Sequence, residues 1–430
     1  MFSDLLTKIK LASFTAPTPY PSFGSKELVS FGRRHRPDYW LVALCIILLT
    51  IGLVVIFSIS PAMSEVYHIS NNYYVEKQLL AILLGLIAFI VAAKIPLTTW
   101  IRFVKPLIII AVGATLLAVI MPVNPSYPAH RWVRLGSFSF QSVEFLKFVL
   151  IIWLAKLLAE NIIKGSIKNV QQTLKPIIIV LVAVGVVVAG IQSDLGSMGV
   201  IVVIIGIMLF IAGVPLKKIA MIIGIITIGL ILSIAVIPYR RERLMTFLNP
   251  TSNCQAENYQ ACQAVIGVGS GGMAGLGLGN SVQAYGYLPE SVNDSIFAIY
   301  AEKFGFIGSV ILLALFVGLF ARIKSVAEHA PDDFSRLIVI GILSWLSVQT
   351  LINVGAMIGV LPLKGITLPF ISYGGTSIVF ALAAVGLVFQ VSAYTTRVSA
   401  VSQSNRGLSH DNSSDRRRFG GAYHPNPSNS

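Results

Sequence analysis

Charged residues are scarce in this sequence. Only 12% of its 430 residues are Asp, Glu, Lys or Arg, whereas soluble domains have about 25%. This shortage excludes an ordinary soluble protein and indicates a membrane protein, in which 55% of the residues are hydrophobic. Alternating hydrophobicity is also lacking, because runs such as "LKPIIIVLVAVGVVVAGI" are continuous. That excludes a transmembrane barrel and leaves a bundle of helices.

Ten apolar runs approach the length of about 20 residues that a membrane-spanning helix needs. They lie at residues 40–60, 78–95, 104–121, 144–160, 175–191, 197–214, 218–237, 305–322, 336–360 and 375–394. The sequence therefore predicts an all-α polytopic membrane protein of ten transmembrane helices, with one membrane domain over 40–394. The polar stretch before the first run is too long for a signal peptide, so this run is expected to be a retained anchor.

Basic residues predict the orientation of this bundle. One side of the predicted membrane collects 22 Lys and Arg and the other side nine. The positive-inside rule therefore places both tails, 1–39 and 395–430, in the cytoplasm. The formal charge of +14 is then mostly a topology signal, and because no nucleic-acid motif accompanies it, no nucleic-acid partner is expected. Both tails have the composition of disordered segments.

Two predicted connections on the other, extracytoplasmic side are long, 122–143 and 238–304. Long ordered loops tend to be functional, so the site is expected on this face. Of only three cysteines, Cys45 is expected to act as a small apolar residue. Cys254 and Cys262 fall in the 238–304 loop, where thiols can oxidise. The sequence does not decide between a disulfide that joins these two cysteines and a pair of free thiols.

Charges near the predicted membrane surface suggest an anionic ligand. Glu144 and Lys147 are three residues apart at the start of a span, where an ionisable side chain is costly unless it is paired. Either a structural ion pair or a charged pair lining a polar cavity would account for them. Several arginines also lie on the side that the positive-inside rule depletes: Arg131, Arg134, Arg240, Arg241 and Arg243. Binding of an anion and snorkelling to lipid headgroups are both consistent with these positions.

Some polar positions have a structural interpretation. The glycine-rich run 267–279 superficially matches a dinucleotide fingerprint, but no βαβ unit surrounds it, so close backbone packing is expected instead. Asp194 is expected to cap the next helix. Gln349 and Asn353, four residues apart inside a span, are expected to join helices rather than bind substrate.

The segment "YLPESVNDSIFAIYAEKFGFIG", residues 287–308, places two carboxylates beside a span. Glu290 and Asp294 would share a face if this turn were helical. A carboxylate with limited access to water at the membrane-facing end of a loop suits a general base, so Asp294 is the candidate catalytic residue. Capping of the following helix is the alternative.

Six sequence blocks, in order and at span boundaries, carry a family resemblance. They are "HRWVRLGSFSFQSVEFLK", "QSDLGS", "RERLMTFLNP", "GSGGMAGLGLGNS", "YLPESVNDSIFAIYAEKFGFIG" and "LPFISYGGTS". Together they resemble the SEDS family (shape, elongation, division and sporulation) of peptidoglycan polymerases over nearly all of 40–394. "GLGNS" and "LPLKGITLPFISYGG" are more similar to its cell-division, FtsW-like branch than to its elongation branch.

The resemblance implies polymerisation of lipid II during septal cell-wall synthesis. It places the catalytic aspartate at Asp294, and substrate-binding residues at Glu290, Glu144 and Lys147. Lys147 and the nearby arginines, with Arg131 and Arg243 as candidates, would offset the charge that develops on the diphosphate. A divalent cation, Mg or Mn, is also implied, although the sequence contains no dedicated metal site. Implied partners are a class B penicillin-binding protein and other divisome membrane proteins. Departures such as Val143 and Ser295 affect local helix geometry rather than the charged positions.

Two other functions compete with this interpretation. A lipid II flippase would also have many spans and intramembrane charges. A non-catalytic divisome scaffold is the third possibility. The grouping of the candidate residues at one face favours the enzyme, because a translocation path needs charge along its full depth.

Overall fold

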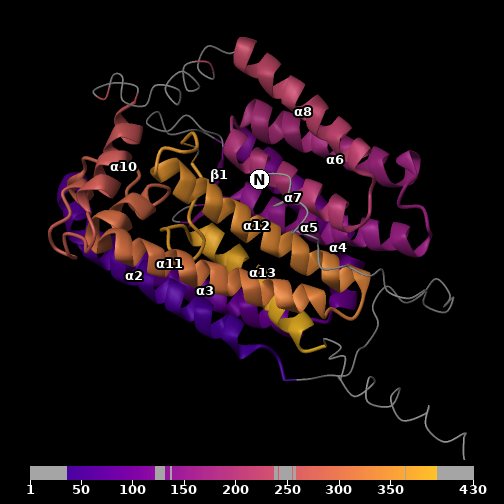
Figure 1. Cartoon of the computed structure of the whole chain (residues 1–430), viewed down its shortest axis with the longest axis horizontal. Coiled ribbons are helices and arrows are strands. Elements are labelled where there is room, and N and C mark those ends of the chain that lie inside the picture. The colour runs from indigo at the N-terminus through magenta and orange to yellow at the C-terminus, as the bar shows by residue number, and fades with distance from the viewer. Residues whose placement is uncertain are drawn as a thin grey trace, which may run out of the picture. The chain divides into compact units, whose positions relative to one another are not determined.

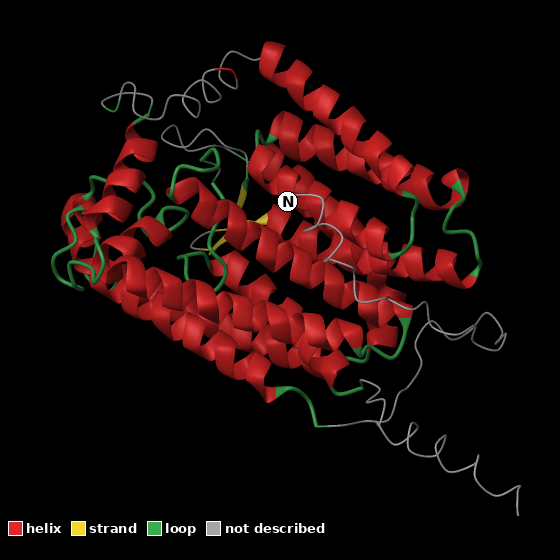
Figure 2. Cartoon of the chain, in the orientation of Figure 1, coloured by secondary structure: helices red, strands yellow, loops and turns green. Residues whose placement is uncertain are grey.

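The computed structural model describes residues 36–121, 131–135, 138–236, 241, 254, 258–363 and 365–394. The described residues belong to one compact unit. Its long helices lie alongside one another (Figure 1), and helix is by far the commonest element (Figure 2). Nearly all of the predicted tails, 1–39 and 395–430, lie outside the described residues.

The described helices follow the predicted spans. Ten helical segments correspond to them: α2 Tyr39–Tyr67, α3 Tyr73–Lys94, α4 Leu97–Ile120, α5 Ser142–Ile163, the run of η1 Val170–Leu174, α6 Lys175–Val184 and η2 Gly185–Ile191, then α7 Leu195–Ile211, α8 Leu216–Val236, α11 Ile296–Glu328, α12 Asp333–Met357 and α13 Gly375–Ser392. Seven of these segments are long and apolar enough to cross a membrane. The fold is therefore that of a multi-pass helical membrane protein, and the total of ten spans stays a prediction. Between α8 and α11 lie the short helix α10 (Tyr259–Ser270) and the turn η3 (Gln283–Tyr285).

Apolar side chains cover the outward faces of this bundle. Phe57 of α2, Ile109 of α4 and Val317 of α11 are 63%, 72% and 65% exposed. Exposing so much apolar surface to water would be unfavourable, but the same surface suits contact with lipid tails. By contrast, α12 and α13 bury most of their residues and form the interior of the bundle. Several residues of the site described below form hydrogen bonds with the inner helix α12.

A two-stranded sheet departs from the expected all-helical architecture. Strands β1 (Trp132–Leu135) and β2 (Phe138–Gln141) pair antiparallel, with Trp132 opposite Gln141. Aromatic and β-branched residues in both segments favour strands. The last residue of β2, Gln141, is also the N-cap of α5, and its N–H donates to Thr376 Oγ1 of α13 at 3.1 Å. The hairpin thus joins the start of α5, with Glu144 and Lys147, to α13.

Helix α11 is broken near its start, and the glycine-rich segment repairs the break. Gly305 has φ 66° and ψ −163°, which interrupts the helical hydrogen bonds. The freed carbonyls of Glu302 and Lys303 accept from the N–H groups of Leu276 (2.9 Å) and Gly277 (3.0 Å). On the other side of the break, the N–H groups of Phe306 and Ile307 donate to the carbonyls of Gly272 (2.9 Å) and Met273 (3.1 Å). The predicted use of these glycines, close backbone packing against a helix, is confirmed.

Replacing Gly275 by Ala is expected to destabilise this repaired break. Gly275 has φ 85°, and a Cβ there would lie 2.2 Å from the carbonyl oxygen of Lys303. The left-handed backbone alone costs an L-residue about 1–2 kcal/mol, and the clash adds to it. Thermal unfolding in detergent should show a clear fall in midpoint. Gly279→Ala is the matched control, because a Cβ at Gly279 meets nothing within 4 Å; equal midpoints for the two variants would contradict this account.

Candidate functional site

The candidate base Asp294 lies in a turn that immediately precedes α11. The carbonyl of Glu290 accepts from the N–H groups of Asn293 (3.0 Å) and Ser295 (3.1 Å), and Glu290 has φ 52°. The turn is therefore not helical, so the condition under which Glu290 and Asp294 would share a helical face is not met. Ser295, not Asp294, is the N-cap residue of α11, and it makes no side-chain capping bond.

Glu290 acts within this turn. Its Oε2 accepts a hydrogen bond from Nδ2 of Asn293, so the side chain folds back over the turn. Both side chains are partly exposed. Glu290 therefore shapes the backbone that presents Asp294, and its predicted contact with substrate stays a prediction.

Arg131 and Asp294 meet beside Gly365. A Cβ placed on Gly365 would lie 3.1 Å from Nη1 of Arg131 and 3.5 Å from Oδ2 of Asp294. A guanidinium and a carboxylate from distant parts of the sequence therefore face the same backbone position, between α12 and α13. A larger residue at 365 would press directly on the guanidinium. Sequence reasoning missed Gly365, and a glycine followed by the apolar "ITLPF" gives no local signal for such a contact.

Arg131 is held in this position by the start of α7. Its Nη2 donates to the carbonyl of Ser193 at 3.2 Å, and its Nε lies 3.8 Å from Oδ2 of Asp194. Asp194 itself caps α7, because its carboxylate accepts from the N–H (3.0 Å) and the hydroxyl (2.8 Å) of Ser197. The prediction that Asp194 caps this helix is confirmed. The same carboxylate also orients the guanidinium of Arg131.

Glu144 and Lys147 form a buried ion pair. Nζ of Lys147 lies 2.7 Å from Oε1 of Glu144 and donates to Oε1 of Gln349 at 2.9 Å. The ammonium also lies 5.1 Å from the ring centroid of Trp345, within the range of a cation–π contact. The Lys147 side chain is only 1% exposed. These contacts favour the structural ion pair of the two alternatives.

Gln349 extends this cluster to the segment before α13. Its Oε1 also accepts from Nε1 of Trp345 at 2.7 Å, and its Nε2 donates to the carbonyl oxygen (3.0 Å) and hydroxyl (3.2 Å) of Thr367. The buried charge pair is thus connected to residues 365–373, which include the contact point of Arg131 and Asp294. The prediction that Gln349 joins elements of the bundle is confirmed; that it reaches a non-helical segment could not be read from its spacing.

The 365–373 segment also holds the turn of Asp294. Ser372 donates from its hydroxyl to the carbonyl of Asn293 at 2.6 Å, and the N–H of Tyr373 donates to the carbonyl of Val292 at 2.8 Å. Burial, and then the neighbouring hydroxyls of Tyr73 and Tyr74, raises the pKa of Tyr373 above its ordinary range. The Tyr373 side chain therefore stays neutral, and the residue contributes to the site through its backbone N–H.

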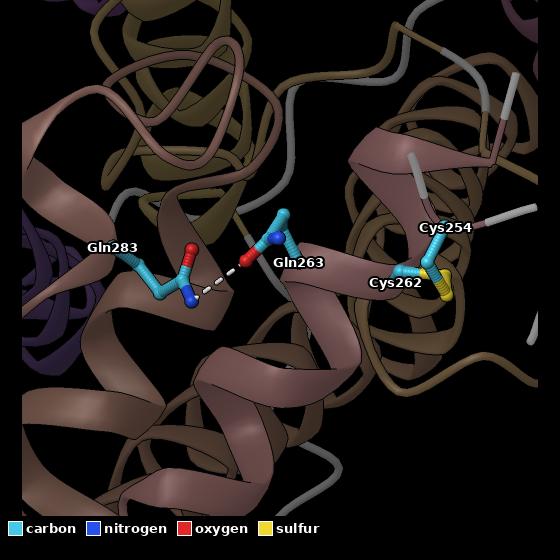
Figure 3. The surroundings of a disulfide bond; sticks show 4 residues. All are labelled: Cys254, Cys262, Gln263 and Gln283. Atoms are coloured by element: carbon cyan, nitrogen blue, oxygen red, sulfur yellow. Dashed lines mark hydrogen bonds between the residues drawn. A yellow bond between two sulfur atoms is a disulfide. The ribbon is translucent and has the colours of Figure 1, made fainter. Parts of the chain in front are cut away.

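Helix α10 supports the same turn from another side. Nε2 of Gln260 donates to the hydroxyl of Ser295 at 3.1 Å, next to Asp294. Cys254 and Cys262 are joined by a disulfide, which answers the question that the sequence left open. Figure 3 shows this bond beside α10, together with the 3.0 Å hydrogen bond between Gln263 and Gln283.

Arg243 is the last of the predicted site residues, and Glu302 and Lys303 are further charges of the segment 287–308. Arg243 falls among residues that are not described. Glu302 is buried and accepts from Ser281 and from the N–H groups of Val282 (2.9 Å) and Gln283 (3.3 Å), while Lys303 donates to the carbonyl of Leu278. Both therefore stabilise the loop. Across the described parts of the chain, no three His, Cys, Asp or Glu side chains are grouped to hold a metal ion.

Comparison with known proteins places this arrangement in a family. A family model described as "Cell cycle protein" (FTSW_RODA_SPOVE) matches residues 39–397. The chain belongs to the FtsW/RodA/SpoVE family. This confirms the SEDS resemblance that the six sequence blocks indicated.

Curated members of the FtsW/RodA/SpoVE family align over most of the chain. "Stage V sporulation protein E" of Bacillus subtilis (strain 168) is 35% identical over 364 residues, covering 84% of this chain and 99% of that protein. "Probable peptidoglycan glycosyltransferase FtsW" of Coxiella burnetii is 36% identical over 364 residues, covering 84% and 96%. Relatives named FtsW agree with the predicted FtsW-like branch.

Solved structures from the same family share the fold. A chain described under "Structural coordination of polymerization and crosslinking by a peptidoglycan synthase complex" superposes with a TM-score of 0.68 at 27% identity, covering 83% of this chain and 97% of that one. The rod shape determining protein RodA of Thermus thermophilus has a TM-score of 0.59 at 23% identity, covering 84% and 98%. At that identity the second comparison concerns the fold alone.

Proposed function

We propose that this protein is a peptidoglycan glycosyltransferase that polymerises lipid II into glycan strands. The observation that carries the proposal is the meeting of the Asp294 carboxylate and the Arg131 guanidinium beside Gly365. A base and a cation at one place are what transfer of a sugar from a diphosphate needs. Curated relatives named peptidoglycan glycosyltransferase support the same conclusion.

In the proposed reaction Asp294 is the general base. An acceptor sugar hydroxyl gives its proton to the Asp294 carboxylate as its oxygen forms a bond to the anomeric carbon of the donor. The bond between that carbon and the diphosphate oxygen breaks, and undecaprenyl diphosphate leaves with the electron pair. Arg131 offsets the negative charge that develops on the leaving group.

The buried pair of Glu144 and Lys147 has an indirect part in this proposal. The Lys147 ammonium is enclosed by Glu144, Gln349 and Trp345. Through Gln349 it fixes Thr367 and hence the segment that carries Gly365. The Arg131 side chain is 24% exposed and is therefore accessible to substrate.

A divalent cation fits this site as a companion of the substrate. Among the described residues no three His, Cys, Asp or Glu side chains are grouped to hold a metal ion, and Mg²⁺ commonly binds through one or two carboxylates together with substrate phosphates. Asp294 and the diphosphate oxygens would hold the ion, which would supply further neutralisation of the leaving group.

Location and partners follow from the same proposal. Both termini are assigned to the cytoplasm and the Asp294 turn to the opposite side, where the septal wall is built. A class B penicillin-binding protein would crosslink the strands, as the neighbouring structure's description of polymerization and crosslinking suggests. Other divisome membrane proteins are further proposed partners.

The purified protein with its transpeptidase partner is expected to convert lipid II into glycan strands. Electrophoresis of labelled product should show strands that lengthen with time, and the same protein in vesicles should not accelerate movement of labelled lipid II between leaflets. Movement of lipid II between leaflets without polymer formation would identify a flippase instead. Absence of both activities would favour the non-catalytic scaffold.

A further inference from the structure

The backbone of the Asp294 turn is fixed by groups outside the turn. Three successive carbonyl oxygens accept hydrogen bonds: that of Val292 from the Tyr373 N–H at 2.8 Å, that of Asn293 from the Ser372 hydroxyl at 2.6 Å, and that of Asp294 from Asn353 Nδ2 at 2.7 Å. The first two donors lie side by side in the 365–373 segment. Asn353 connects the turn to the buried helix α12.

Asn353 uses its amide group twice. Nδ2 donates to the carbonyl of Asp294 at 2.7 Å and to the carbonyl of Ile366, also at 2.7 Å. The residue is only 2% exposed, so water does not replace either bond. Ile366 follows Gly365, the position that Arg131 and Asp294 both contact. One amide therefore ties the backbone of Asp294 to the segment whose Gly365 lies beside both Asp294 and Arg131.

We propose that Asn353 is a positioning residue for the transfer reaction, acting through the backbone of Asp294 and Ile366. This inference rests on the function proposed above. Asn353 touches neither substrate nor leaving group, and it keeps the Asp294 carboxylate at the separation from Arg131 that the reaction needs. Small displacements of a catalytic group are costly, since an error of about 1 Å lowers the rate by roughly 100-fold.

Only a side chain that donates two hydrogen bonds can hold the carbonyl oxygens of both Asp294 and Ile366. A carboxylate of the same size accepts but does not donate, and it would place negative charge against two carbonyl oxygens. When protonated, the same carboxyl regains one donor. The activity of Asn353→Asp relative to the native protein at the same pH should therefore rise as pH falls.

Steady-state polymerisation of lipid II by the purified complex tests the inference. Asn353→Asp should lower kcat by roughly 10- to 100-fold and leave KM within about twofold, since binding contacts are kept. Asn161→Asp is the matched control: Asn161 is 4% exposed and its Nδ2 donates to the carbonyl of Gln172 at 3.2 Å, between α5 and η1. Its kcat should stay within about twofold of the native value.

Hydrogen exchange gives a readout that does not depend on activity. In Asn353→Asp, amides of residues 290–295 and 366–373 should exchange faster than in Asn161→Asp, while those of α12 stay protected. If the native protein makes no glycan strands, the proposed function is contradicted. The hydrogen-exchange comparison then still tests the role of Asn353.

Three results would overturn the inference. They are an unchanged kcat in Asn353→Asp, a ratio of activities that does not rise at lower pH, and equal exchange in the two variants. Asn353→Gln, which keeps the amide on a longer side chain, should remain folded with a kcat reduced by roughly tenfold. Global unfolding of both variants would assign Asn353 to the stability of the fold and also overturn the proposal.

Discussion

Replacing Asp294 by Asn is expected to leave a folded protein that makes no detectable glycan strands. The amide has nearly the size of the carboxylate but does not take a proton from the acceptor hydroxyl. Loss of a general base lowers rates by about 10²- to 10⁴-fold. The turn should survive, because its bonds from Asn353, Ser372 and Tyr373 go to backbone carbonyls. Polymerisation of labelled lipid II, with thermal unfolding measured in parallel, checks both halves of the expectation.

Asp332→Asn is the matched control for this change. Asp332 caps α12, where its carboxylate accepts from the N–H and the hydroxyl of Ser335 at 2.8 and 2.9 Å, far along the helix from Asn353. The substitution makes the same change of carboxylate to amide and should leave polymerisation close to the native rate. Normal strand synthesis by Asp294→Asn would remove Asp294 from the mechanism. An equal loss in the control would show that the effect is not specific to the site.

Replacing Lys147 by Met is expected to have the largest effect on stability. It leaves the Glu144 carboxylate buried without its cation, and Oε2 of Glu144 already lacks a hydrogen-bond partner. Breaking a buried pair in this way costs about 3–5 kcal/mol. The midpoint of thermal unfolding should fall markedly, and activity should fall with it because Gln349 and Thr367 lose their support.

A double substitution separates the two possible roles of Lys147. Glu144→Gln combined with Lys147→Met removes both charges, so much of the lost stability should return. If Lys147 acts through the fold, activity should recover with stability. A double variant that is stable and has a strongly raised KM for lipid II would show instead that the ammonium contacts the diphosphate, as the family resemblance implied.

Features encoded by local composition could be predicted. Apolar runs placed the helices well: the tenth run begins at Gly375, where α13 begins, and the eighth begins at Gly305, where α11 is broken. Asp194 was identified as a cap because capping depends on residues only a few positions away. Such features follow from short-range hydrogen bonding and from the length of apolar segments.

Features that depend on contacts between distant segments could not be predicted. The approach of Arg131 to Asp294 requires Gly365, and no pattern around Gly365 reports that meeting. Spacing alone does not reveal the positive φ of Glu290, which makes the turn before Asp294 non-helical. Asn353 was recognised as polar and buried, but its partners are backbone carbonyls, which every residue carries.

The repaired break in α11 has a consequence for the biogenesis of this protein. Its backbone groups near Gly305 are satisfied by residues 272–277, which precede the helix in the chain. In hydrocarbon an unsatisfied carbonyl or N–H costs several kcal/mol. During synthesis, docking of the glycine-rich segment and membrane integration of this part of α11 are therefore coupled steps.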